Sequence, residues 1–560
     1  MLTTSLVFAG GTTTNKRRAR AEKPVDIKIV PVGMSPEELD KLKERTERSA
    51  TVQNELNGAS YRLISFGYLE TNDKATSGIF APQRFRIIFY DYTNERTLVA
   101  EGDLSQPEDV RVFEDASKPD ASVEEFDYAV QILQQNSEFG TALKSNTLKT
   151  FQAMPPITVS EDNNERLINV GLSSLDNSTA NEVVSVSLKN EKVIRYPSHA
   201  PPTSMATPTA CGVPDSGQST TGSGTAGQYQ MTVSQNGTTL WEMLVIRPSA
   251  SSGSRKSGIE LRDLKYRGKM VLKRAHSPIL NVQYMGGQCG PYRDWQYQED
   301  MFQTAAGSTD PAPGIRILPP GSVAKTVLES GTDTGDFRGV AVYTQDNETV
   351  LVTEMQAGWY RYLMEWRLAN DGTIRPRYGF GATDDSCVCF VHNHHVYWRF
   401  DFDIVNANNN VFIAERGRKF LTPVTTEAAI SRSYQTNRSI VVQNATGDEA
   451  YMLVPNLTDG VADTFGKGDF WLLKYKNVVG GTSFQNEIDD GVNCTTCSTA
   501  YIQIAQFLNG ESLVNQDSVV WYGAHFIHSD GASLSDPDGN GKFFLSGSHV
   551  VGPDIRPIRW

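Results

Sequence analysis

The feature that most constrains the fold is a long series of short apolar runs, from about residue 228 to the C-terminus. These runs are rich in β-branched and aromatic residues, and turn-forming residues separate them, as in TTLWEMLVIRP (238–248), KMVLKRAH (269–276) and DSVVWYGAHFIH (517–528). Runs of this length and composition are typical of strands. Many of them in succession predict a large antiparallel β-sandwich.

A chain of 560 residues is too long to fold around a single hydrophobic core, so two to four domains are expected. The divisions that we expect are a disordered tail (1–24), a charged helical segment (25–57), a small α+β domain (58–157) and the sandwich (158–560). In the helical segment Ser35 stands at the N-cap and Glu38 at the capping-box position. A second helix is expected over 120–143, within the α+β domain. The fold class is therefore mainly β.

Charge and hydropathy exclude two classes of partner. The net charge of −13 argues against a nucleic-acid binder, which would present a basic face. No run of eighteen apolar residues occurs, so we expect no membrane-spanning helix. Six cysteines in a chain of this length do not form a disulfide framework. The Cys494–Cys497 pair is interpreted as a local disulfide or a pair of thiols rather than a zinc site.

The stretch HNHHVYWRFDFDI (392–404) contains three of the eight histidines. If it is a strand, His392 and His394 lie on one face and His395 lies on the other. Two imidazoles on one face can bind one metal ion, and affinity alone favours copper. A third ligand is expected from the C-terminal strand, where His525 and His528 have opposite parity, so that only one of them joins the site. The alternative is that these histidines pack in the core or lie at the surface.

Three segments together resemble the copper amine oxidase superfamily. In that family H-x-H is followed by Arg and Asp at fixed distances, as His392, His394, Arg399 and Asp401 are here. Upstream, the stretch WYRYLMEWRLANDGTI (359–374) places Tyr360 where the family has the tyrosine that becomes the quinone cofactor topaquinone. The stretch DSVVWYGAHFIH is similar to the family's C-terminal copper segment. The likeness extends over roughly residues 60–560.

This resemblance implies a reaction and a set of partners. Family members use copper and topaquinone to convert a primary amine, O2 and water to an aldehyde, ammonia and hydrogen peroxide. By this resemblance copper would be held by His392, His394 and either His525 or His528, and Tyr360 would be the quinone precursor. Tyr292 matches the tyrosine that hydrogen-bonds the quinone. The partners are then a small-molecule substrate and O2, and the resemblance favours a homodimer in an extracellular or periplasmic location.

The chain departs from the family pattern at the residues that carry the chemistry. The family's Asn-Tyr-Asp/Glu is here Trp359-Tyr360-Arg361, and the position of the family's general base is occupied by Gln303, which cannot accept a proton. Asp300 is the replacement that we expect, with Glu299 as the alternative. The two cysteines of a family disulfide are replaced by Thr332 and Thr334.

These departures leave three hypotheses. The first is a copper-dependent oxidoreductase of the amine oxidase type, with unchanged or altered chemistry. The second is a catalytically inactive copper-binding or structural β-sandwich. The third is a different metal, such as zinc, in a hydrolytic site. Asp401 and Asp403 share one face of their strand, which a calcium site or pairing with Arg399 explains equally well.

Overall fold

The structure is a computed structural model that describes most of the chain from residue 25 to residue 560. The segments outside the described residues are 1–24, 70–81, 161, 175–181, 196–210, 218–219, 223–224, 285–288, 290–291, 461, 463–467, 477–486, 491–501 and 529–549. The expected disordered tail and the Cys494–Cys497 pair therefore lie outside the part that the structure describes.

The first small unit is a four-stranded sheet with two helices. Its elements are α1 (Pro36–Glu47), α2 (Ala50–Leu56), β2 (Tyr61–Leu69), β3 (Arg84–Asp91), β4 (Arg96–Asp103) and β5 (Gln106–Asp115). The capping box predicted at Ser35 and Glu38 is present. The single helix expected over 35–57 is two helices, because Ser49 accepts a hydrogen bond from the Val52 N–H and caps a new helix.

A second small unit repeats this arrangement. It comprises α3 (Val123–Gln135), α4 (Gly140–Lys144), β6 (Leu148–Val159), β7 (Arg166–Ser174), β8 (Glu182–Ser187) and β9 (Lys192–Arg195). The boundary expected near residue 157 is therefore not a domain boundary, and two small units stand where one α+β domain was expected. Pro155 and Pro156 suggested a domain boundary. They lie instead at an irregularity of the β6–β7 ladder, where missing N–H donors are tolerated.

A buried ion pair joins helix α3 to this second sheet. Arg166 on β7 contacts Glu125 on α3 at 2.6 Å, and both side chains are fully buried. Tyr92 from the first unit donates a hydrogen bond to the same carboxylate. Helix α3 is thereby attached to both units.

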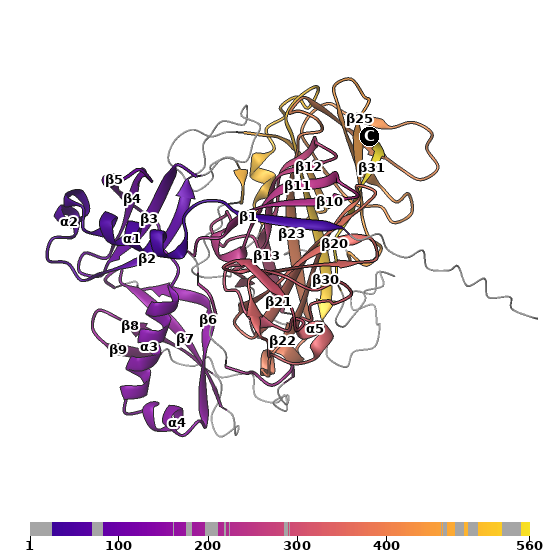
Figure 1. The fold of residues 1–560 in the computed structure, drawn as a ribbon. Helices are drawn as coiled ribbons and strands as arrows, with labels where there is room; N and C mark the ends of the chain where they lie inside the picture. Colours follow the sequence, from indigo (N-terminus) through magenta and orange to yellow (C-terminus); the bar gives the residue numbers. More distant parts are fainter. Residues whose placement is uncertain are drawn as a thin grey trace, which may run out of the picture.

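The remainder of the chain forms two large sheets. The ten-stranded sheet has the order β1 (Asp26–Pro31), β10 (Gln228–Gln235), β11 (Thr238–Ile246), β12 (Glu260–Tyr266), β13 (Lys269–Tyr284), β23 (His392–Phe402), β30 (Ser518–His528), β29 (Phe470–Lys474) and β26 (Ala428–Ile430), with β14 (Tyr292–Arg293) paired to β13. Strand β1 precedes both small units in the sequence, yet it lies in the sandwich, as Figure 1 shows.

The second sheet has eleven strands. Their order is β16 (Thr309–Ala312), β17 (Ile315–Ile317), β19 (Val340–Gln345), β20 (Glu348–Ala357), β21 (Tyr360–Ala369), β22 (Ile374–Ala382), β31 (Asp554–Arg559), β28 (Ala450–Val454), β27 (Ser439–Asn444), β24 (Asn409–Ala414) and β25 (Thr422–Val424). The shorter elements are β15 (Met301–Phe302) paired with β18 (Phe337–Arg338), α5 (Val327–Ser330), and the 3-10 turns η1 (Pro248–Ala250), η3 (Ser386–Cys389) and η6 (Ile504–Phe507).

One continuous core lies between the two large sheets. Trp241 and Trp398 from the first sheet and Trp366 from the second are fully buried in it. The turn between β21 and β22 approaches this core closely: Gly372 has φ +95°, and a Cβ atom there would lie 2.6 Å from the Tyr266 ring. The expected mainly β fold with a large antiparallel sandwich is thus confirmed. Among the described residues, no helix is long and apolar enough to cross a bilayer.

Candidate metal centre

Three histidines meet at one end of the ten-stranded sheet. Strands β23 and β30 are antiparallel, with His392 directly opposite His528 and His395 directly opposite His525. Directly opposed residues share a face, so His528 joins His392 and His394. The ring centroid of His392 lies 4.9 Å from that of His394 and 4.9 Å from that of His528.

His525 lies on the other face of the sheet. Its Nδ1 is 2.9 Å from Nδ1 of His395, and its Nε2 is 3.2 Å from the Gly468 carbonyl oxygen. Of the two alternatives for the third histidine, the structure therefore groups His528 with the pair on β23. His276 is also buried, but its Nδ1 lies near the hydroxyls of Ser252 and Ser257.

Hydrogen bonds fix which ring nitrogens of the β23 pair are available. His392 Nδ1 donates to the Phe390 carbonyl oxygen at 2.7 Å, because a carbonyl can only accept. His394 Nδ1 lies 3.2 Å from the Tyr362 hydroxyl. The Nε2 atoms of His392 and His394 are buried and have no hydrogen-bond partner among the described residues.

Burial also keeps these imidazoles neutral. It lowers the pKa of His392 to about 3 and holds the pKa of His394 well below its usual range. Neutral imidazole is the form that binds a metal ion. Two buried Nε2 lone pairs, with a third imidazole beside them, match the nitrogen-rich donor set that copper prefers.

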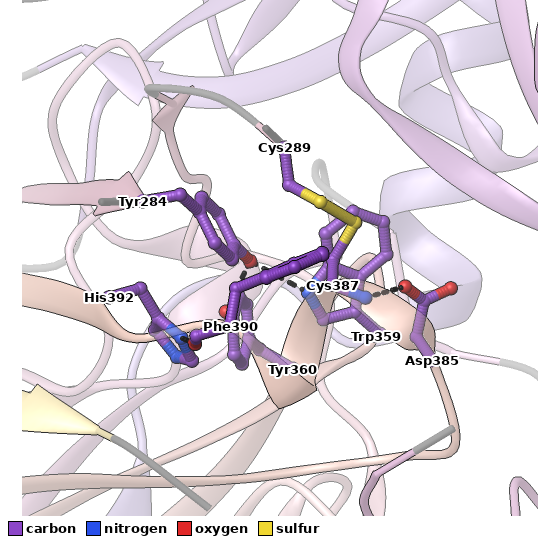
Figure 2. The surroundings of a disulfide bond; sticks show 8 residues. All are labelled: Tyr284, Cys289, Trp359, Tyr360, Asp385, Cys387, Phe390 and His392. Atoms are coloured by element: carbon purple, nitrogen blue, oxygen red, sulfur yellow. Dashed lines mark hydrogen bonds between the residues drawn. A yellow bond between two sulfur atoms is a disulfide. The ribbon is translucent and has the colours of Figure 1, made fainter. Parts of the chain in front are cut away.

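Tyr360 projects from β21 of the facing sheet towards these histidines. It is fully buried, and its ring centroid lies 4.8 Å from that of His394 and 5.6 Å from that of His392. Its hydroxyl is hydrogen-bonded to the Tyr284 hydroxyl, which also accepts the Trp359 Nε1–H at 3.0 Å. Figure 2 shows these aromatic side chains beside His392.

Tyr284 makes the hydrogen bond to Tyr360 that the sequence analysis expected from Tyr292. Tyr292 packs with its ring centroid 6.1 Å from that of Tyr284 and 6.3 Å from that of Trp359. The hydroxyl that bonds Tyr360 comes from Tyr284, the last residue of β13, which pairs with His392. The sequence signal for it was its place at the end of an apolar strand, which resembles ordinary core packing.

A carboxyl group beside this cluster belongs to Asp294, which the sequence analysis did not select as the base. The Tyr362 hydroxyl donates to Asp294 Oδ2, and the same hydroxyl lies beside His394. Asp294 Oδ1 is buried and has no hydrogen-bond partner within the described part of the chain. Burial raises the pKa of Asp294 to about 7. In the sequence, Asp294 is visible only as the acidic residue of the stretch PYRDW (291–295).

Asp300, the expected replacement base, lies elsewhere. Its carboxylate is 2.8 Å from Arg361 Nε, and Asp333 contacts the same guanidinium at 2.6 Å. Arg361 follows Tyr360 on a strand, so its side chain points to the opposite face. Asp300 thus lies behind the strand that carries Tyr360. Burial raises its pKa to about 6.

The other positions named from the sequence are also apart from Tyr360. Glu299 pairs with the buried Arg247. Gln303 is half-buried and donates to the Thr332 hydroxyl at 3.2 Å. Thr332 and Thr334, which replace two family cysteines, lie with their hydroxyl oxygens 3.1 Å apart.

Four of the six cysteines form two disulfides, which the sequence analysis did not predict. Cys211 is bonded to Cys389, and Cys289 is bonded to Cys387. Both bonds join segments far apart in the sequence, and so spacing gave no signal for them. A separate group of carboxylates, Asp401, Asp403 and Asp517, has oxygens within 4.8 Å of one another, and Arg399 lies 3.8 Å from Asp401.

Comparison with known proteins shows which solved structures share this fold. No protein-family model and no curated protein matches the sequence. Among solved structures, a copper-containing benzylamine oxidase from Hansenula polymorpha is similar with a TM-score of 0.55 and 14% identity, over 92% of this chain and 96% of that one.

Two further solved structures give the same result. Aspergillus nidulans amine oxidase matches with a TM-score of 0.56 and 12% identity, over 94% of this chain and 88% of that one. Pichia pastoris lysyl oxidase matches with a TM-score of 0.52 and 13% identity, over 93% and 88% of the two chains. The fold is therefore that of the copper amine oxidases. At this level of identity the likeness establishes the fold alone.

Proposed function

We propose that this protein is a copper-dependent oxidoreductase that oxidises primary amines with O2, releasing aldehyde, ammonia and hydrogen peroxide. The observation that carries the proposal is the position of Tyr360 against His392 and His394, with His528 beside them. A copper ion, together with a quinone derived from Tyr360, would supply the two-electron oxidation of the amine and the transfer of electrons to O2.

The histidines would hold the ion. His392 and His394 offer Nε2, because both Nδ1 atoms are engaged in hydrogen bonds. His528 is the third ligand that we propose, in preference to His525. The neutral state of the buried rings makes binding independent of proton release near pH 7.

Asp294 would move the proton. A carboxyl group with a pKa of about 7 is divided between acid and base near neutral pH, which is the condition that favours general base catalysis. Its Oδ2 is held by the Tyr362 hydroxyl, while Oδ1 remains available to accept a proton from substrate. We therefore assign the base to Asp294 in place of Asp300, whose carboxylate is bound to Arg361.

Tyr284 and Trp359 would orient Tyr360. The Trp359 N–H donates to Tyr284, and the Tyr284 hydroxyl is bonded to Tyr360. The tryptophan that replaces the family's asparagine thus supports the orientation of the Tyr360 ring through a second residue. Arg361 does not charge the site, since Asp300 and Asp333 neutralise it on the other face.

The setting of the enzyme is part of the proposal. Two disulfides favour an oxidising compartment, in agreement with an extracellular or periplasmic location. We propose a homodimer, a small-molecule amine and O2 as partners, and no nucleic-acid or membrane partner.

Peroxide release tests the proposal. Protein reconstituted with copper in air is mixed with a panel of primary amines, and hydrogen peroxide is measured. We expect peroxide from at least one amine and none from the Tyr360→Phe variant. Copper binding without peroxide from any amine would favour the second candidate, an inactive copper-binding sandwich. The observation on its side is that Tyr360 has no exposed surface.

A further inference from the structure

The disulfide Cys289–Cys387 lies beside Trp359, next to the aromatic residues of the candidate metal centre. Cys387 belongs to the turn η3, and Cys289 follows β13, so that the bond joins segments 98 residues apart. Figure 2 shows the disulfide above the ring cluster formed by Tyr284, Trp359 and Tyr360.

Within the described residues, the ladders of β23 begin at a metal ligand. Tyr284 and His392 are the outermost described pair between β13 and β23, and His392 and His528 are the outermost described pair between β23 and β30. Residues at the end of a ladder open more readily than residues inside it. His392 is the first residue of β23, so the turn that precedes it bears on its position.

The turn η3 restrains His392 through the backbone. The Phe390 N–H donates to the Cys387 carbonyl oxygen at 3.2 Å, and the Phe390 carbonyl oxygen accepts the His392 Nδ1–H at 2.7 Å. The Asp385 carboxylate caps the same turn at the Cys387 N–H, at 2.8 Å. The position of Cys387 thus sets the hydrogen bond that leaves His392 Nε2 available.

The other cysteine of the disulfide, Cys289, is close in the sequence to Tyr284, whose ring faces His392. Cys289 follows Tyr284 by five residues, and the Tyr284 ring centroid lies 4.9 Å from that of His392. The Cys289–Cys387 bond therefore links the chain that follows Tyr284 to the turn that precedes His392. Both cysteines are half-buried.

We propose that the Cys289–Cys387 disulfide is a redox-sensitive latch that keeps His392 in the metal-binding arrangement. A small dithiol opens the latch by exchange: its two thiols form a disulfide, and two electrons and two protons pass to Cys289 and Cys387. The turn is then released from β13, and metal affinity falls. This inference rests on the proposed metal site.

The test measures metal affinity rather than turnover. Metal-free protein is reduced with dithiothreitol, its thiols are blocked with iodoacetamide, and the reagents are removed. Zn²⁺, which does not oxidise thiols, is then titrated in competition with a chelator. We expect affinity to fall by about 10- to 100-fold, the usual effect of losing a group that orients a metal ligand.

Two double variants assign the effect. Cys289→Ser with Cys387→Ser should bind Zn²⁺ as weakly before reduction as after it. Cys211→Ser with Cys389→Ser retains the latch and should still lose affinity on reduction. Circular dichroism in the far ultraviolet checks that each variant is folded.

The outcomes separate the latch from the metal site. Untreated protein that binds no metal would refute the proposed function. If untreated protein binds metal and reduced protein binds it with equal affinity, the latch alone is refuted.

Discussion

At the residue scale, the partners of the ring nitrogens decide what the histidines can do. With Asp294 ionised, the Tyr362 hydroxyl donates to the carboxylate and accepts the His394 Nδ1–H. The Phe390 carbonyl oxygen accepts the His392 Nδ1–H. Both rings are thereby held in the tautomer that presents Nε2, as oriented ligands of a metal site require.

Histidine replacement distinguishes the two faces of the sheet. We expect His528→Gln to abolish stoichiometric copper binding, because it removes an imidazole from the face of His392 and His394. The matched variant His525→Gln changes the opposite face and should retain the metal. Elemental analysis of purified protein measures both, and loss of copper in the His525 variant alone would reverse the assignment.

Asp294→Asn removes the proposed base but preserves the shape of the side chain. We expect turnover to fall by about 10²- to 10⁴-fold, with copper content unchanged, since an amide cannot accept a proton. Gln303→Ala is the control, because Gln303 is half-buried and bonded to Thr332. Equal losses in both variants would contradict the role of Asp294.

The pH profile should report the same carboxyl group. Burial raises the pKa of Asp294 to about 7, so that the group is protonated and inactive below this pH and ionised above it. We expect kcat/KM to rise with pH and to level off above about 7 in a wild-type profile. A profile without an inflection between pH 6 and 8 would contradict the assignment.

The sequence predicted part of this site for clear physical reasons. Strand parity separated His392 and His394 from His395 correctly. Parity could not choose between His525 and His528, because the choice depends on the register of β30 against β23. Asp294 was missed because only the fold brings it to Tyr362, and spacing pointed to Gln303 instead.

At the element scale, the caps were predictable and the breaks were not. Ser35 and Ser122 cap their helices as their capping-box patterns indicate. The helix expected over 120–143 ends at Gln135 and resumes at Gly140, because the Asn136 side chain accepts the backbone N–H of Glu138. Such local competition is common for asparagine and gives a weak signal in a periodic pattern.

The attachment of α3 can be tested by breaking its buried ion pair. Glu125→Ala leaves Arg166 buried without its partner, and we expect the free energy of unfolding to fall by about 3 to 5 kcal/mol. The neighbouring Glu124 is exposed, so Glu124→Ala should change it by less than about 0.5 kcal/mol. Chemical denaturation compares the two, and similar unfolding midpoints would show that the pair does not hold the helix.

At the scale of the whole molecule, the sandwich was predictable and the pairing across it was not. The series of short strands required large sheets, but strand β1 joins the sandwich from the far end of the chain. The two disulfides likewise bridge 98 and 178 residues. Contacts of such long range follow from the tertiary fold, which residue spacing does not encode.

We propose that Tyr360, beside three histidines, becomes a quinone when copper is bound. The most direct measurement adds phenylhydrazine to copper-reconstituted protein in air and locates the adduct by peptide mass spectrometry. We expect a coloured adduct on the peptide that contains Tyr360, and no adduct in metal-free protein or in Tyr360→Phe. Copper bound at full stoichiometry with an unmodified Tyr360 peptide would contradict it.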